Sequence, residues 1–237
     1  MTPDEGLRRS SLLVQLRPLA PALAALYLPP ATLLVLIALV SLQTGIHVSY
    51  FTRDPTAILQ ASPFVGVLSN IGVLLWCAAA AICFFCAALL RCPGVRQEVP
   101  VFFLASGLLT LLLLVDDLFR LHDFILPTYG HIGQEAFYAG YSVLAGLYLV
   151  RFRDLLLKTK CLILATALGA LGLSVMVDVL PETLLPWHFL VEDGLKLLGI
   201  VGWAGYWVGT GFQAVRSRLT ASRLPIPQIA LGDALGD

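Results

Sequence analysis

Long uncharged apolar runs dominate the pattern of hydrophobic and polar positions along this chain. Six of them approach the length of about 20 residues that a helix needs to cross a hydrocarbon core about 30 Å thick. Only helices and closed barrels satisfy all their backbone hydrogen bonds in lipid. The pattern therefore predicts an all-α bundle of six transmembrane helices, at residues 30–46, 64–90, 101–121, 135–150, 161–177 and 189–215.

The composition favours lipid over water as the solvent for most of the chain. Of its 237 residues, 58% are hydrophobic and only 13% are charged, and the mean hydropathy is +0.86. A soluble domain is typically about one quarter charged. The formal net charge is zero, with no basic stripe, and this argues against nucleic-acid binding.

The basic residues predict the orientation of the bundle. Twelve of the fifteen lie in alternate segments, namely the N-terminal segment, the second and fourth loops, and the C-terminal tail. Lys and Arg accumulate in cytoplasmic loops, so both termini are expected in the cytoplasm, in a membrane of the bacterial inner-membrane type. The expected organisation is a cytoplasmic segment leading into the first helix (1–29), the transmembrane domain (30–215) and a cytoplasmic tail (216–237).

This topology places most of the chemistry at the non-cytoplasmic helix ends, where all four histidines and nine of the fifteen acids fall. The uncharged stretches of the third, fourth and fifth helices have 15 to 17 residues, or roughly 22–26 Å of helix. Because that is shorter than the hydrocarbon core, the outer acids should dip below its edge and face the bundle interior. A polar vestibule lined by helices three to six is the expected result.

The third helix carries the densest group of charges. Asp116, Arg120 and Asp123 are spaced i, i+4 and i+7, so on a continuous helix Arg120 would neutralise both acids. Asp117 points elsewhere and needs another partner. Asp178 is the deepest acid of the fifth helix. Asp116, Asp117 and Asp178 are the candidate catalytic carboxylates, with an interfacial salt-bridge ladder as the structural alternative.

Two histidine–glutamate pairs suggest a metal site. His131 with Glu135, and His188 with Glu192, are each spaced i, i+4, which puts both side chains on one face of a helix. Imidazole and carboxylate ligands suit zinc, iron or manganese. The alternative is that these histidines only lie at the membrane interface. A divalent transition metal is the cofactor that this pattern predicts.

Lys196 lies one turn inside Glu192 on the sixth helix. A lysine at this depth must pair with an acid or lose its proton. Glu192 at i−4 is the local partner, and Asp116 or Asp117 could reach it across the bundle.

Three functions remain open at this stage. A metal-dependent membrane hydrolase would act on a lipid-like substrate from the outer leaflet. A proton- or cation-coupled transporter would use the acids as a relay, although the cytoplasmic halves of the helices show almost no ionisable residue. A non-catalytic accessory or assembly protein would bind another membrane protein. Gly205 and Gly209 form a G-x-x-x-G that predicts a packing or homo-oligomer face.

Overall fold

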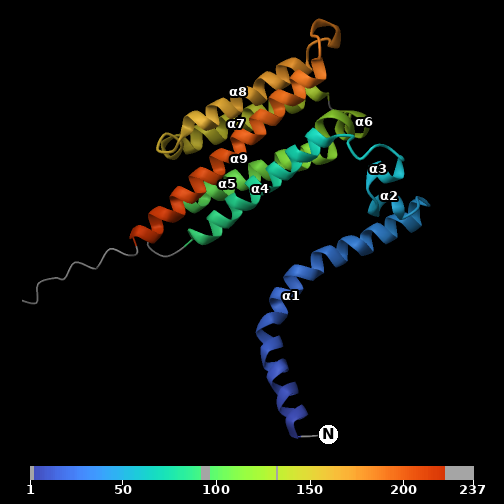
Figure 1. Ribbon diagram of the computed structural model, residues 1–237, viewed down its shortest axis with the longest axis vertical. Coiled ribbons are helices and arrows are strands. Elements are labelled where there is room, and N and C mark those ends of the chain that lie inside the picture. The colour runs from blue at the N-terminus through green and yellow to red at the C-terminus, as the bar shows by residue number, and fades with distance from the viewer. Residues whose placement is uncertain (1–2, 92–96, 132, 222–237) are drawn as a thin grey trace, which may run out of the picture. The chain divides into compact units, whose positions relative to one another are not determined.

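A computed structural model describes the backbone of residues 3–91, 97–131 and 133–221, and their side chains from residue 19 on except at 122, 123, 126, 134, 135, 182 and 221. These residues are helical, without a strand (Figure 1). The elements are α1 (Pro3–Thr44), α2 (Ser49–Thr52), α3 (Pro55–Ile58), α4 (Val67–Leu89), α5 (Glu98–Phe119), a π-helical turn (Leu121–Ile125), α6 (Leu126–Gly130), α7 (Gln134–Leu156), α8 (Cys161–Asp178), a 3-10 turn (Glu182–Leu184) and α9 (His188–Ala221).

Four helices are long and apolar enough to cross a membrane: the Leu19–Thr44 part of α1, together with α4, α5 and α8. The chain is therefore a helical, membrane-embedded protein. The first apolar stretch begins earlier than the expected residue 30. The helices expected at 135–150 and 189–215 are present as α7 and α9. They are not among these four because charged residues near the ends of α7, and glycine, tryptophan and tyrosine residues along α9, lower their mean hydropathy.

The chain divides into two units, Met1–Val65 and Gly66–Asp237. The first contains α1, α2 and α3, and the apolar stretch of α1 has no buried side chain. Asp54 caps α3 by accepting hydrogen bonds from the backbone N–H groups of Thr56 and Ala57. The Thr56 side chain, followed by these backbone donors, holds the pKa of Asp54 below its ordinary value.

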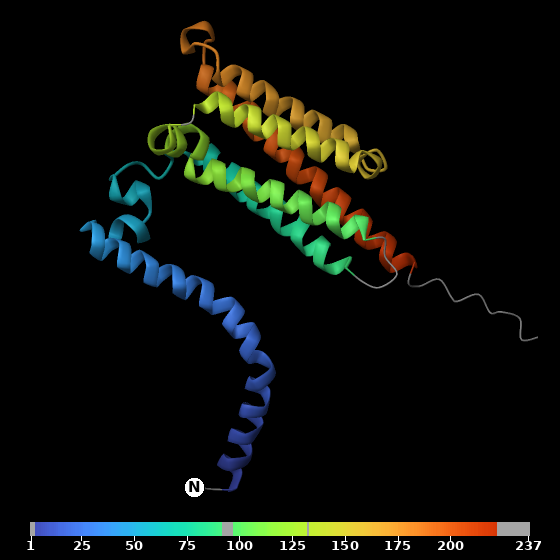
Figure 2. The ribbon, with the colours of Figure 1, turned by 180° about the vertical axis from the view of Figure 1, so that it is seen from behind.

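The second unit is a bundle in which α4, α5, α7, α8 and α9 run side by side (Figures 1 and 2). Helix α9 packs against both α8 and α4. Gly72 of α4 approaches Ile200 of α9, and Cys86 approaches Gly211, so α4 and α9 run in the same direction. Helices α8 and α9 form an antiparallel hairpin around the Glu182–Leu184 turn.

Aromatic rings fill the core of this bundle. Trp207 is fully buried, and its ring lies 4.8–6.1 Å from four neighbouring rings in tilted or edge-to-face contacts. Such geometries suit the ring quadrupoles. Because lipid removes the hydrophobic drive for helix association, this close packing carries much of the cohesion. The buried rings are Trp76, Phe102, Phe103, Tyr148, Phe152, Trp203, Tyr206 and Trp207.

Glycines on α9 divide into two groups. A Cβ at Gly199 would lie 2.6 Å from Leu171 Cγ of α8, so only a glycine allows this approach. Gly205 and Gly209 have no described atom within 4 Å of the place where a Cβ would be. The G-x-x-x-G is therefore not used for packing among the described residues, and its role in a homo-oligomer remains a prediction.

We expect Gly199→Ala to lower the free energy of unfolding by about 1–3 kcal/mol, because the new methyl group overpacks the α8–α9 contact. Gly205→Ala, on the same helix but in open space, should change it little. Reversible unfolding in detergent micelles, followed by tryptophan fluorescence, would measure both. Equal losses in the two variants would contradict this account of the contact.

Candidate functional site

A buried ion pair joins α5 to α9. Lys196 Nζ donates to Asp117 Oδ1 at 2.5 Å, and the Asp117 side chain is only 8% exposed. The second oxygen, Oδ2, is buried without a described hydrogen-bond partner. Gly72 of α4 lies beside it, since a Cβ there would be in ordinary van der Waals contact with Oδ2, at 3.8 Å. Of the partners that the sequence left open for Lys196, the structure thus selects Asp117, and three helices meet at this point.

Asp116 faces a different helix from its neighbour. Adjacent residues on an α-helix point about 100° apart, and the buried Asp116 carboxylate turns to α7, where it is hydrogen-bonded to the Tyr141 hydroxyl. The two neighbouring aspartates therefore link α5 to two other helices. The sequence predicted that they would diverge, but not that a tyrosine would receive one of them.

Two further contacts join α7 to α8 and α8 to α9. The Tyr138 hydroxyl donates to Asp178 Oδ2 at 2.5 Å, at the last residue of α8. One turn earlier, the Ser174 hydroxyl donates to the backbone carbonyl of Glu192 at 3.0 Å. Asp178 and Lys196 are both within electrostatic reach of the Glu192 carboxylate.

Together these contacts close a circuit from α5 to α7, α8, α9 and back to α5, which we call the polar ring. Tyr138 and Tyr141 share one face of α7, since they are three residues apart. Tyr141 and Ser174 are the members that sequence reasoning missed. The ring consists of Asp116, Asp117, Tyr138, Tyr141, Ser174, Asp178, Glu192 and Lys196.

His188 lies beside the ring at the start of α9. Its Nε2 is 3.7 Å from Glu192 Oε2, which is electrostatic contact but longer than a hydrogen bond. The His188 side chain is 5% exposed, and its Nδ1 is buried without a described partner. An opening of about 430 Å³ lies over this residue, and its other walls are Leu185, Trp187, Phe189 and Leu190.

The other predicted histidine pair does not form as expected. His131 is exposed and has a left-handed backbone (φ 53°), and α7 begins only at Gln134. His131 therefore does not share a helical face with Glu135, whose side chain lies outside the described ones. Among the side chains that are described, no three of His, Cys, Asp and Glu gather closely enough to hold a metal ion.

The predicted stripe of Asp116, Arg120 and Asp123 does not lie on one continuous α-helix, because α5 ends at Phe119. Arg120 closes the helix with a left-handed backbone (φ 51°), and a π-helical turn follows. The i, i+4, i+7 spacing therefore no longer corresponds to one face. The Asp123 side chain lies outside the described residues.

Residues 28–210 match the family described as a domain of unknown function, DUF8692. The chain belongs to the DUF8692 family. No curated protein and no solved structure matches it. Because the matched range includes every member of the polar ring, the ring lies within the DUF8692 domain and not in an appended segment.

Removing one partner of the Asp117–Lys196 pair should destabilise the DUF8692 bundle. We expect Lys196→Met to cost about 2–3 kcal/mol of unfolding free energy, below the full 3–5 kcal/mol of a buried pair because Lys196 is 36% exposed. Asp117→Asn with Lys196→Met should cost less than the two single changes added together. Unfolding in micelles provides the double-mutant cycle.

The exposed pair of Arg153 and Asp154 is the matched control. Its atoms are 3.5 Å apart, but the side chains are 74% and 81% exposed. Breaking it should cost about 0–1 kcal/mol. Strict additivity at Asp117 and Lys196 would show that this ion pair contributes no coupling.

Proposed function

We propose that the DUF8692 protein is a six-span membrane protein whose polar ring takes up and releases protons or a cation during proton- or cation-coupled transport. The observation that carries the proposal is the charge balance of the ring. The ring contains four carboxylates and one lysine on membrane-embedded helices. Asp193 lies next to Glu192 and adds one more acid. Arg120 and His188 add two basic residues. Among these residues, the acids still outnumber the basic residues.

The contacts along α7 and α9 support six spans. Helix α7 meets α5 at Tyr141 and Asp116 near one end, and at Phe152 and Phe102 near the other. Helix α9 keeps contact with α4 from Ile200 to Gly211. Because α4 and α5 qualify as spans, helices that follow them along this length should cross the same thickness. Together with α1 and α8, the count is six.

The basic residues support a cytoplasmic location for both termini. In the five-helix unit they are concentrated at the end opposite the polar ring, where α4, α7 and α9 end and α8 begins. The positive-inside rule then assigns the ring to the non-cytoplasmic side. The described basic residues at this end are Arg91, Arg151, Arg153, Lys158, Lys160, Arg216 and Arg218.

The chemistry of the ring follows from its surroundings. Carboxylates held close together in a medium of low dielectric cannot all ionise, so the excess is neutralised by protons or a bound cation. Lys196 forms an ion pair with one of these carboxylates, Asp117. The remaining acids then exchange protons or a cation with the adjacent aqueous phase, and ionisable groups at such positions are typical of coupled transporters.

Buried hydroxyl groups extend from the ring into the other half of the bundle. Thr110 accepts a hydrogen bond from Trp203 Nε1 at 3.0 Å, and the hydroxyl groups of Ser106 and Tyr148 are 2.7 Å apart. These hydroxyl groups support the transport proposal, because they place hydrogen-bonding groups in the half of the bundle that has almost no ionisable residue.

Asp178→Asn and Glu192→Gln should each reduce proton flux into proteoliposomes at least about tenfold, because each change removes a carboxyl group that exchanges protons. A pH-sensitive dye inside the vesicles measures the flux under an imposed pH gradient. Asp193→Asn is the matched control, since Asp193 is exposed beside Glu192. Wild-type flux no higher than in protein-free vesicles, or an equal loss with Asp193→Asn, would refute the proposal.

A metal-dependent hydrolase is a second candidate, favoured by one observation. His188 and Glu192 face each other beneath an opening with apolar walls, where a lipid-like substrate could enter from the membrane. The pair supplies two ligands, so a metal would need a third from side chains outside the described set or from a substrate. A metal-bound water would provide the nucleophile for hydrolysis.

Elemental mass spectrometry of the detergent-purified protein separates this candidate from the transporter. If transport is the function, wild type and His188→Ala should both contain less than about 0.1 zinc, iron or manganese per chain, because two ligands bind a metal weakly. About one metal per chain, lost in His188→Ala, would instead favour the hydrolase.

An accessory or assembly protein is the third candidate, because each contact described in the ring joins two different helices. On this reading the ring only stabilises the bundle. Substitutions of its acids would then lower the free energy of unfolding, and the wild-type protein would show no proton flux. The activity to measure would be the binding of a protein partner.

A further inference from the structure

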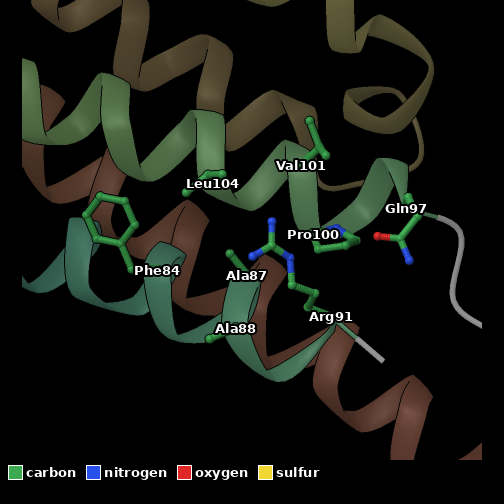
Figure 3. Close-up of a pocket in the computed structure, with 8 residues that line it drawn as sticks. All are labelled: Phe84, Ala87, Ala88, Arg91, Gln97, Pro100, Val101 and Leu104. Atoms are coloured by element: carbon green, nitrogen blue, oxygen red, sulfur yellow. The ribbon is translucent and has the colours of Figure 1, made fainter. Parts of the chain in front are cut away.

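A cavity of about 160 Å³ lies between the end of α4 and the start of α5, at the end of the bundle opposite the polar ring (Figure 3). Its walls are apolar and come from Phe84, Ala87 and Ala88 of α4 and from Pro100, Val101 and Leu104 of α5. Two polar side chains, Arg91 and Gln97, line its mouth.

Small residues and one close contact create this space. The Phe84 ring packs closely against α5 because residue 107 is a glycine, since a Cβ there would be 2.8 Å from Phe84 Cε1. Ala87 and Ala88 then leave the neighbouring turn without bulk. Val101 and Leu104 are 43% and 37% exposed, so the cavity opens sideways toward the surrounding lipid.

Arg91 supplies an unneutralised positive charge at the mouth. Figure 3 shows its guanidinium group turned back between the two helices, toward Pro100. No carboxylate among the described side chains forms an ion pair with it. The Gln97 amide adds a second hydrogen-bond donor beside it. A guanidinium group with free donors is a preferred partner for phosphate.

The depth of these groups matches that of a phospholipid. Arg91 lies two residues beyond the end of α4 and Gln97 one residue before α5, and both helices are candidate spans. The mouth is therefore at the level of the lipid headgroups. Phe84 and Leu104 are seven residues from Arg91 and Gln97 respectively, which places them about 10 Å deeper into the hydrocarbon.

We infer that this cavity binds one anionic phospholipid, with its phosphate on Arg91 and Gln97 and the first methylene groups of one acyl chain against the apolar walls. The inference does not depend on the proposed transport. A free phosphate would leave the apolar walls unused. A zwitterionic lipid would bring a second positive charge close to Arg91. Basic pockets between transmembrane helices on the cytoplasmic side are typical sites for anionic headgroups.

Native mass spectrometry of the full-length protein in detergent tests the inference, with phosphatidylglycerol and phosphatidylcholine of identical acyl chains as probes. Wild type should retain one phosphatidylglycerol in preference to phosphatidylcholine. Arg91→Gln should weaken phosphatidylglycerol binding about fivefold, the effect of one basic residue near an anionic lipid surface. Arg91→Lys should restore most of it. Ala88→Phe, which fills the cavity from an exposed position, should weaken both lipids.

Arg216→Gln is the matched control, since Arg216 is an exposed arginine at the same end of the bundle but outside the cavity. It should leave binding unchanged. Equal binding of the two lipids, equal losses in the Arg91→Gln and Arg216→Gln variants, or displacement of the lipid by millimolar inorganic phosphate would each overturn the inference. Far-ultraviolet circular dichroism confirms that the variants compared are folded.

Discussion

A charge that lies among membrane helices must have a partner, and in this bundle that requirement is met by Lys196 and Asp117. Either group alone would be costly to bury. The pair fixes the register of α9 against α5, because the next contacts lie about two turns and then three to four turns away from it on both helices. Trp203 donates to Thr110, and the Trp207 ring lies against Phe103. The aromatic core is thus aligned by an electrostatic contact at its end.

The polar ring and the aromatic core contribute differently to helix packing. Apolar contact between helices gains little over contact with lipid, so the aromatic side chains of the core hold the helices together by close packing. Close fit alone tolerates a helix that slides or rotates. Hydrogen bonds such as that from Tyr138 to Asp178 have only one satisfactory geometry. The ring therefore specifies which helix faces which, and the core supplies the contact area.

The sequence revealed much of the fold but little of the pairing in the site. Apolar run lengths gave the helices, and the angle between adjacent residues showed that Asp116 and Asp117 must have different partners. The end of α5 was missed because Arg120 adopts a left-handed backbone that a non-glycine residue rarely takes. Tyr141 was missed because a tyrosine within an apolar run does not differ in pattern from a core aromatic. Partners on other helices depend on tertiary packing, which periodicity does not encode.

Charged side chains are accommodated differently at the two ends of the bundle, and the environments of the two ends explain the difference. At the ring, the acids and Lys196 lie among membrane helices and find their partners within the protein. At the other end, Arg91 lies beyond the last turn of α4, where water and headgroups can solvate it. A guanidinium group there costs little without a protein partner, yet its position above an apolar cavity gives it selectivity that solvation alone would not. The lipid site and the ring can therefore be altered independently, since neither depends on the other for neutralisation.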